Sequence, residues 1–404
     1  MTGYAELLGR LFQARRFGVV LGLTRMRALM DALDAPDREL GQVVHVAGTN
    51  GKGSTVAMIA ALARAAGKRV ATYTSPHLSS LRERIMIDGV PIPEEALVDA
   101  AERVQAAGGD ELTFFEQVTA MAMVAIADAA VDVTVLEVGL GGRLDATNVV
   151  DAPIAVVTGI ALDHQAILGD TIAAIAAEKA GIFKLGQEVV IGISGDPSAT
   201  PLLVTAAELA GAASIVVAGN TVRVPLLSLP GEHQLKNAAC AIAAVRALGL
   251  PIVGSALAAV VHPGRYERVG NVILDGAHNP DGAAALAAQL AHEPGRIALV
   301  LGVSADKDAR AIAAPLVPRA AQIIATRYQQ DRALVPEALA DAIRSLGAAG
   351  VEIAPDLRSA LERAQGADLI VVCGSLFLVG EARVLLLGAP ADPIAVTDPA
   401  PPSG

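Results

Sequence analysis

The sequence predicts an α/β protein with two domains: a larger N-terminal domain built on a mainly parallel sheet, and a smaller C-terminal α/β domain. Apolar, β-branched runs of strand length alternate along the chain with Ala-rich stretches of helical length. A glycine-rich turn joins the first such strand to a helix, as in P-loop-type domains. The alternation breaks at residues 262–266 and then resumes, and a length of 404 residues suits two domains.

The composition indicates cores of small aliphatic side chains, because 53% of the residues are hydrophobic and only 2% are aromatic. The net charge of −11 argues against a nucleic-acid partner. Cys240 and Cys373 lie far apart in sequence, which suits a reducing compartment and offers no disulfide framework. No apolar run is long enough to cross a bilayer, and the start lacks a signal-peptide pattern. We therefore expect a cytoplasmic protein without a membrane partner.

The first candidate site is the turn at residues 48–55, which reads Gly-Thr-Asn-Gly-Lys-Gly-Ser-Thr. A strand at 43–47 precedes it and a helix at 56–64 follows, so glycine amides and a helix N-terminus can surround phosphate oxygens while Lys52 reaches the terminal phosphates. Ser54 or Thr55 could face magnesium. The spacing is shorter than the usual G-x-x-x-x-G-K-[ST], however. From these residues alone, a glycine-rich turn with a solvent-facing lysine remains the alternative.

The N-terminal domain is predicted over residues 1–268. Its further strands are expected at 69–74, 131–139, 154–158 and 188–193, with a hairpin about Asp88-Gly89 and short strands up to about 228. Helices are predicted at 94–106, 114–129, 171–181, 201–210, 234–248 and 254–261. The run at 131–139 is almost entirely apolar, which is typical of a parallel strand buried on both faces.

The C-terminal domain is predicted over residues 269–390 as a Rossmann-like α/β fold. Strands near 272–275, 296–302, 320–326, 350–353 and 368–373 alternate with helices, which predicts a second parallel sheet. Residues 391–404 are rich in Pro, Asp and Ala, and we expect this tail to be disordered.

Polar side chains follow several predicted strands at their carboxyl ends, where open parallel sheets bind ligands. Lys52 follows the first strand, Ser75 the second, Glu137 ends a third, and His164 lies after a fourth. This set suits a magnesium–ATP site, because Mg²⁺ prefers oxygen ligands and leaves room for phosphates. Glu137 is the strongest metal candidate, with a helix-capping carboxylate as its alternative. A structural histidine explains His164 equally well.

Two neighbouring charged residues have simpler explanations when the residues are considered alone. Lys179 lies near the C-terminal end of a predicted helix, where a lysine needs no functional explanation, so it is interpreted as a surface charge. Asp163 is interpreted as the cap of the turn that follows it.

Ordered motifs extend from about residue 18 to 380. They are Ala-Gly-Thr-Asn-Gly-Lys-Gly-Ser (47–54), Ser-Pro-His-Leu (75–78), Arg-Glu-Arg-Ile (82–85), Thr-Phe-Phe-Glu (113–116), Glu-Val-Gly-Leu-Gly-Gly-Arg-Leu-Asp-Ala-Thr-Asn (137–148), Leu-Asp-His (162–164), Glu-Lys-Ala-Gly-Ile (178–182), Pro-Gly-Arg (263–265), Asp-Gly-Ala-His-Asn-Pro (275–280), Asp-Lys-Asp (306–308) and Cys-Gly-Ser (373–375). Together they resemble the dihydrofolate synthase/folylpolyglutamate synthase family of the Mur-type ligases. The short phosphate loop is this family's own version.

The resemblance implies an ATP-dependent amide-bond ligase that joins L-glutamate to dihydropteroate, to folates, or to both. A substrate carboxylate attacks the γ-phosphate of ATP to give an acyl phosphate and ADP. The amine of L-glutamate then displaces phosphate, which yields dihydrofolate or folylpolyglutamates. The partners are therefore small molecules, two Mg²⁺ sites are expected, and the family suggests a monomer.

The resemblance also assigns roles to individual residues. It implies ATP contacts by Thr49, Asn50, Gly51, Lys52, Gly53, Ser54, Asn237, Arg265 and Asp275, and metal ligation by Ser75, Glu137, His164 and Lys179. Lys179 matches a carboxylated lysine, which reverses its interpretation as a surface charge. The pteroate or folate pocket is implied for Thr113, Phe114, Phe115, Glu116, Leu144, Asp145 and Ala146. Lys52, Lys179 and His278 are the implied catalytic residues, and Ser375 is placed near glutamate or the intermediate.

Two residues depart from the family pattern: Val20, where an Asp is more frequent, and His262, where an aromatic or aliphatic residue is usual.

A peptidoglycan Mur ligase is the nearest alternative, but it needs a nucleotide-sugar domain before the phosphate loop, and only 47 residues precede Gly48. A P-loop protein that regulates a partner is an alternative of another class. The sequence leaves open whether the enzyme has one activity or two, which folate it prefers, and how many glutamates it adds.

Overall fold

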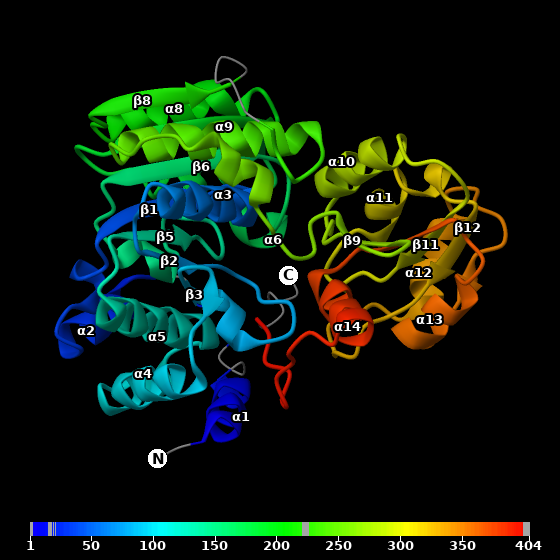
Figure 1. The fold of residues 1–404 in the computed structure, drawn as a ribbon, viewed down its shortest axis with the longest axis horizontal. Helices are drawn as coiled ribbons and strands as arrows, with labels where there is room; N and C mark the ends of the chain where they lie inside the picture. The colour runs from blue at the N-terminus through cyan, green and yellow to red at the C-terminus, as the bar shows by residue number, and fades with distance from the viewer. Residues whose placement is uncertain (1–2, 15–17, 19, 21, 220–225, 399–404) are drawn as a thin grey trace.

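The computed structural model describes residues 3–14, 18, 20, 22–219 and 226–398, and it forms two α/β domains that lie side by side (Figure 1). This confirms the predicted fold class. The short strands expected at 220–225 lie outside the described residues.

The N-terminal domain is built on an eight-stranded sheet with the order β4-β3-β2-β5-β1-β6-β7-β8. Neighbouring strands from β2 to β8 run parallel, whereas β3 and β4 form an antiparallel edge. Asp88 (φ 52°) and Gly89 (φ 83°) make the predicted hairpin turn. The strands are β1 (Gln42–Ala47), β2 (Val70–Tyr73), β3 (Ile85–Ile87), β4 (Val90–Pro91), β5 (Val133–Glu137), β6 (Ile154–Ile160), β7 (Glu188–Gly195) and β8 (Ser214–Ala218).

Helices cover both faces of this sheet. One face packs against α3 and α9, and the other packs against α5, α7 and α8. Every residue of β5 and β6 is consequently buried, which explains their predominantly apolar sequences. The helices of this domain are α1 (Tyr4–Ala14), α2 (Thr24–Ala32), α3 (Lys52–Ala65), α4 (Glu94–Ala106), α5 (Phe114–Ala129), α6 (Gln165–Leu168), α7 (Ile172–Ala180), α8 (Ala199–Leu209) and α9 (Glu232–Ala247).

The C-terminal domain contains a six-stranded sheet with the order β13-β12-β11-β14-β10-β9. Only β9 is antiparallel among the described strands of this sheet. The strands are β9 (Glu267–Val269), β10 (Val272–Leu274), β11 (Ile297–Leu301), β12 (Gln322–Ala325), β13 (Glu352–Ile353) and β14 (Leu369–Cys373). The helices are α10 (Pro280–Leu290), α11 (Ala309–Ala313), α12 (Pro336–Arg344), α13 (Leu357–Arg363) and α14 (Leu376–Leu387). Because β9 begins at Glu267, the predicted boundary after residue 268 falls inside a strand of the second domain.

The prediction of a disordered tail is wrong for residues 391–398. After α14 the chain returns to the N-terminal domain (Figure 1), where Val396 is fully buried. The Asp392 carboxylate accepts hydrogen bonds from Tyr4 Oη (2.8 Å), Ser80 Oγ (2.8 Å) and the Leu81 amide (2.7 Å). These specific partners offset the low apolar content from which disorder was predicted. Residues 399–404 lie outside the described part of the chain.

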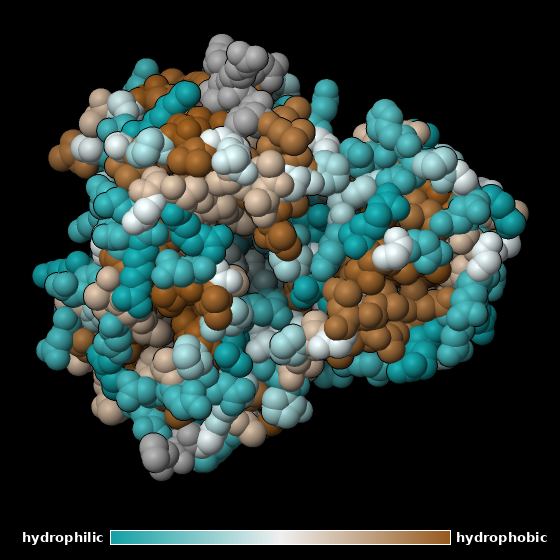
Figure 2. Space-filling model, viewed as in Figure 1, coloured by the Kyte–Doolittle hydropathy of each residue, from teal (hydrophilic) through white to brown (hydrophobic). Residues whose placement is uncertain are grey.

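Within the described ranges, no helix combines the length and the apolar character needed to cross a membrane. The visible face carries hydrophilic and apolar residues side by side, and a recess separates the two domains (Figure 2).

The contacts of Asp392 predict a measurable contribution to stability. Asp392→Ala removes one carboxylate that satisfies three donors, so the free energy of unfolding should fall by about 1–3 kcal/mol. Urea denaturation measures this change. Asp99→Ala, which removes an exposed carboxylate 3.9 Å from Arg103, is the control and should cost less than about 0.5 kcal/mol. Equal stability of the two variants would contradict the ordered tail.

Candidate active site

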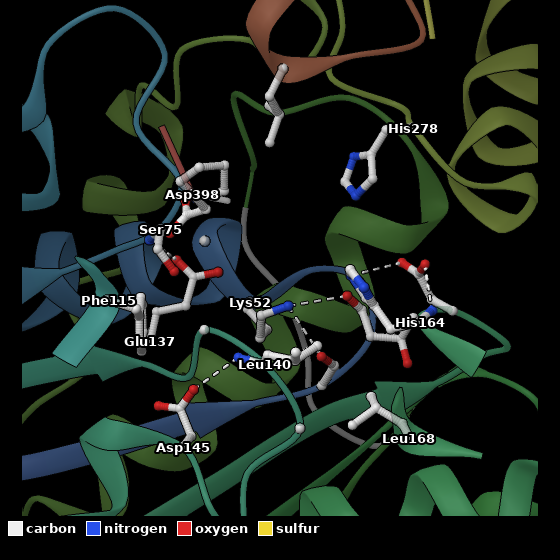
Figure 3. Close-up of a pocket in the computed structure, with 18 of the residues that line it drawn as sticks. Lys52, Ser75, Phe115, Glu137, Leu140, Asp145, His164, Leu168, His278 and Asp398 are labelled. Carbon is white, nitrogen blue, oxygen red and sulfur yellow. Dashed lines mark hydrogen bonds and ion pairs between the residues drawn. The ribbon is translucent and has the colours of Figure 1, made fainter. Parts of the chain in front are cut away.

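One cleft between the domains receives the carboxyl ends of β1, β2, β5 and β6 together with side chains of the C-terminal domain (Figures 2 and 3). The parallel sheet thus brings strand ends together that are far apart in sequence. Most of the predicted site residues line this cleft: Thr49, Asn50, Gly51, Lys52, Gly53, Ser54, Ser75, Thr113, Phe115, Glu116, Glu137, Leu144, Asp145, Ala146, His164, Lys179, Arg265, His278 and Ser375.

Two glycines with positive φ shape the phosphate loop. A Cβ atom at Gly48 (φ 147°) would lie 1.9 Å from Thr158 Oγ1, and one at Gly51 (φ 85°) would lie 2.2 Å from Asn237 Oδ1. Gly51 directly precedes α3, so the unpaired amides of the first helical turn lie at the cleft. The loop therefore offers main-chain donors to an anion without side chains in the way.

The loop is fixed to the neighbouring strand β6. The Thr49 amide donates to Gly159 O (2.8 Å), and Thr49 Oγ1 both donates to Ala161 O (3.1 Å) and accepts from the Ala161 amide (3.0 Å). Thr158 Oγ1 donates to Asn50 O (2.7 Å). These bonds hold the phosphate loop in register with the loop after β6, which carries Asp163 and His164.

Lys52 and Glu137 place opposite charges at the mouth of the phosphate loop. Lys52 Nζ donates to the carbonyls of Gly48 (3.1 Å) and Thr49 (3.2 Å). Glu137, the last residue of β5, is 5% exposed and accepts from the Ser75 amide (3.3 Å). Burial raises the pKa of Glu137, whereas the charge of Lys52 and the Ser75 amide act in the opposite direction.

The ligand atoms at this position fit a magnesium ion that is coordinated partly by the protein and partly by phosphate oxygens. Within the described residues, no group of three or more His, Cys, Asp and Glu side chains could hold a metal. Mg²⁺ does not require such a group, because it binds through one or two carboxylates and completes its shell with hydroxyls, water and phosphates. Glu137 and Ser75 supply a carboxylate and a hydroxyl. Burial lowers the pKa of His164 to about 4, so its imidazole is neutral and has a lone pair available.

Lys179 is buried in the cleft, so its interpretation as a surface charge is wrong. Its side chain is only 5% exposed, although its position near the C-terminal end of α7 was predicted correctly. Burial and the nearby charge of Lys52 lower the pKa of Lys179 to about 7. A substantial fraction of the amine is therefore neutral at physiological pH, and a neutral amine can react as a nucleophile.

Phe115 forms an aromatic wall at the opposite side of the cleft from His278 (Figure 3). Its ring lies over Gly139, where a Cβ atom would come within 2.3 Å of Phe115 Cζ. The neighbouring Phe114 was predicted to contact the same ligand, but it is fully buried in the core and does not line the cleft. Successive residues at the start of α5 point about 100° apart, and Phe114 is the one that points into the core while Phe115 points toward the cleft.

Two buried carboxylates beside Phe115 hold the surrounding backbone. Glu116 forms an ion pair with Arg25 (2.8 Å) and accepts from the amide (2.9 Å) and hydroxyl (2.7 Å) of Thr113, which fixes the start of α5. Asp145 accepts from the amides of Leu140 (2.8 Å) and Thr147 (3.0 Å). Glu116 accepts from Arg25 on both oxygens, and Asp145 also accepts from Thr147 Oγ1 (2.5 Å), so donors of the chain itself occupy most of the roughly four acceptor positions of each carboxylate.

Asn237 and Asp275, both predicted to contact ATP, lie behind the cleft lining. Asn237 packs against Gly51 and donates to Gln234 Oε1 (3.1 Å). Asp275 accepts from the amides of Tyr266 (2.8 Å) and Ala277 (2.9 Å), so it orders the connection between the domains next to Arg265.

The residue that departs from the family pattern, His262, lies against the phosphate loop. Its Nε2 atom is buried without a hydrogen-bond partner among the described residues, 2.9 Å from the position of a Cβ on Gly53. Val20, the other departure, lines the cleft and is 47% exposed.

Polar contacts across the domain interface include residues that the sequence reasoning missed. The side-chain amide of Asn279 donates to Asn50 Oδ1 (2.9 Å) and to Asp163 Oδ2 (3.0 Å). Lys307 forms a 2.6 Å ion pair with Asp163, and these opposing charges hold the pKa of Asp163 far below its usual range. Asn279 and Lys307 belong to the motifs at 275–280 and 306–308, so these motifs could have identified both residues as functional. Asp163, interpreted as a turn cap, is a link between the domains.

The chain matches two family models: "Mur ligase middle domain" over residues 46–208 and "Mur ligase, glutamate ligase domain" over residues 264–376. The dihydrofolate synthase/folylpolyglutamate synthase of Mycobacterium tuberculosis is 39% identical over 90% of this chain and 89% of its own length. A probable bifunctional folylpolyglutamate synthase/dihydropteroate synthase of Haloferax volcanii is 36% identical over 94% of this chain. The chain spans only 50% of that relative's length.

Solved structures agree with this relationship. M. tuberculosis folylpolyglutamate synthase complexed with ADP superposes with a TM-score of 0.87 at 37% identity, covering 95% of this chain and 100% of that chain. A bifunctional folylpolyglutamate synthase/dihydrofolate synthase with Mn, AMPPNP and L-glutamate bound gives a TM-score of 0.83 at 33% identity, covering 91% and 95%.

The fold and cleft therefore define a Mur-type ligase, a class of ATP-dependent enzymes. Within this class, the chain belongs to the dihydrofolate synthase/folylpolyglutamate synthase family. The predicted resemblance is confirmed. The regulatory and peptidoglycan alternatives are not supported by these relatives.

The geometry of Gly51 predicts that this position rejects any side chain. Gly51→Ala places a Cβ on Asn237 in addition to straining a positive φ, so nucleotide affinity should fall at least about tenfold, as measured by calorimetry with ADP. Gly67→Ala is the matched control, because Gly67 has a similar φ of 82° and nothing within 4 Å of a Cβ. Both variants should lose about 1 kcal/mol of stability from the backbone strain. Unchanged ADP binding by Gly51→Ala would contradict this description of the loop.

Proposed function

We propose that this chain uses ATP to join L-glutamate to dihydropteroate and to folates through an acyl-phosphate intermediate. The observation that carries the proposal is a single cleft containing the phosphate loop, the Glu137 carboxylate, the aromatic wall at Phe115 and the C-terminal His278. Such a cleft can hold a triphosphate, an aromatic carboxylic acid and an amine at the same time. We also propose that the protein acts in the cytoplasm as a monomer.

In the first step, the substrate carboxylate attacks the γ-phosphate, and ADP leaves. Negative charge is spread over the transferring phosphoryl group, so catalysis requires fixed positive charge and accurate alignment. The amides of residues 50–54 and the Lys52 ammonium provide donors at the phosphate loop, while Arg265 approaches from the domain connection. Phe115 would stack against the aromatic part of the substrate, and Asp145 would accept a hydrogen bond from it.

In the second step, the amine of L-glutamate attacks the acyl phosphate, and phosphate leaves. The geometry supports His278 as the proton acceptor. Its Nδ1 lies 2.7 Å from the Gly276 carbonyl and must carry the hydrogen, which leaves the Nε2 lone pair free. Burial lowers the pKa of His278 to about 4, so the ring is neutral at physiological pH. Ser375, which is 2% exposed and lines the same cleft, is proposed to help position glutamate or the intermediate.

For the divalent cations, we propose Ser75, Glu137 and His164 as ligands of magnesium and a carboxylated Lys179 as a ligand of a second metal site. The metal ions would neutralise phosphate charge. A lysine ammonium cannot bind a metal, whereas its carbamate has two oxygens that can. The lowered pKa of Lys179 supports the modification, because CO₂ reacts with the neutral amine.

The proposed activity is tested with purified protein, Mg–ATP and L-glutamate, with dihydropteroate and tetrahydrofolate supplied separately. ADP release should require both glutamate and a pteroate or folate. Lys52→Ala should lower kcat by at least about a hundredfold, because it removes a charge at the transferring group. If the parent protein turns over neither dihydropteroate nor tetrahydrofolate, the proposed function is refuted. Full activity of Lys52→Ala would show that Lys52 does not act at the phosphate site.

The carbamate makes a separate prediction. Lys179→Ala should be inactive, and short carboxylates such as formate should restore part of its activity. Carbamate occupancy should rise as the pH rises through about 7, because the folded protein releases the Lys179 proton there rather than near 10.5. A ¹³C NMR signal from ¹³C-bicarbonate, present in the parent protein and missing in Lys179→Ala, provides a readout independent of activity. Normal activity of Lys179→Ala in CO₂-free buffer would refute the modification.

A further inference from the structure

A buried arginine lies beneath the cleft wall and is paired with the C-terminal segment. Arg84, at the end of the turn Leu81–Arg84, is 0% exposed. Its guanidinium donates to both carboxylate oxygens of Asp398, at 2.6 and 3.3 Å. Asp398 is the last described residue of the chain and comes from beyond the C-terminal domain. A guanidinium in a dry environment requires such a partner, because an uncompensated buried charge is strongly destabilising.

The surroundings hold Arg84 in one orientation. Its Nε donates to His77 Nδ1 (2.9 Å), and its Cζ lies 5.2 Å from the centre of the Phe114 ring. Burial lowers the pKa of His77 to about 3, so His77 is neutral and does not compete as a second cation. Arg84 therefore presents a fixed fork of two N–H donors, the arrangement that binds a carboxylate.

Asp398 lies between this fork and the cleft. It lines the cleft together with Ser75, Phe115 and Glu137, and 26% of its side chain remains exposed (Figure 3). The carboxylate on Arg84 is thus at the boundary between the phosphate side and the aromatic side of the cleft. If the C-terminal segment moves away, the fork opens onto this boundary.

The two proposed acceptor substrates, dihydropteroate and a folate, differ in the number of carboxylates that they bring to the cleft next to Arg84 and Asp398. Dihydropteroate carries one carboxylate, which is the group that reacts. The terminal glutamyl residue of a folate carries two, so one remains unreacted a few bonds from the phosphate loop. Near the buried Glu137 carboxylate this second negative charge needs a cation. Arg84 holds Asp398, which lines the cleft together with Glu137, and its fork matches the missing partner.

We propose that Arg84 binds the unreacted carboxylate of a folate's terminal glutamyl residue, and that Asp398 occupies this site when no folate is bound. The inference rests on the proposed function. It makes Arg84 a specificity residue for folates over dihydropteroate, and it makes the C-terminal segment a competitor for the same site.

The ratio of two Michaelis constants tests this competition. Asp398→Asn removes the competing charge, so the KM for tetrahydrofolate divided by that for dihydropteroate should fall. This ratio should fall about tenfold if Asp398 is paired with Arg84 in nine-tenths of the molecules of the parent protein. Asp128→Asn is the matched control, because it neutralises a carboxylate paired with Arg103 at 2.6 Å on the exposed surface. An unchanged ratio in Asp398→Asn would overturn the proposal.

A double variant tests the role of Arg84 itself. Arg84→Met with Asp398→Asn removes both buried charges, which proteins tolerate better than the loss of one. The ratio should then rise above that of the parent protein. A ratio equal to that of Asp398→Asn alone would exclude Arg84 as the site.

Thermal unfolding provides a readout that needs no turnover. Tetrahydrofolate should raise the Tm of Asp398→Asn more than that of the parent, whereas dihydropteroate should raise both equally. Equal shifts with tetrahydrofolate would overturn the proposal. If the parent turns over neither substrate, the proposed function fails, and the Tm comparison still reports on Arg84.

Discussion

The active cleft depends on the polar contacts that join the phosphate loop to the second domain. Asn50 lies in the loop itself, and its side chain bonds to Asn279 at the start of α10. Asn279 and Lys307 both bond to Asp163, which follows β6. The same segment that offers amides to phosphates thus holds the C-terminal domain over the cleft. An acyl phosphate survives for transfer only where water is excluded, so the reaction depends on contacts that bring the two domains together at the phosphate loop.

The charge distribution suits this task. The chain has a net charge of −11, yet Lys52, Lys179, Lys307 and Arg265 all line one cleft. Five carboxylates, those of Glu116, Glu137, Asp145, Asp163 and Asp398, line the same cleft. The cations therefore act as local donors to phosphate and carboxylate oxygens rather than as an excess of positive charge, and each is costly to bury. The three lysines meet this cost differently. Lys307 pairs with Asp163, Lys52 rests on loop carbonyls, and Lys179 loses part of its charge.

Local patterns predicted the sheet and the meeting of its strand ends, because a parallel strand between two helical layers is predominantly apolar. The same reasoning located Ser75, Glu137 and His164 at one edge. It could not predict features that depend on how distant segments dock. The burial of Lys179, the inward turn of Phe114 and the return of the tail to Arg84 all arise from tertiary contacts. Asp163 was interpreted as a turn cap because its partners lie more than 100 residues away.

Isotope transfer tests the central claim most directly. Dihydropteroate labelled with ¹⁸O in its carboxylate is incubated with the protein, Mg–ATP and L-glutamate, and the phosphate released is analysed by mass spectrometry. Attack of the carboxylate on the γ-phosphate requires that one labelled oxygen leaves with the phosphate when the amide forms. We predict one ¹⁸O atom per phosphate. Unlabelled phosphate accompanying dihydrofolate formation would contradict the acyl-phosphate route.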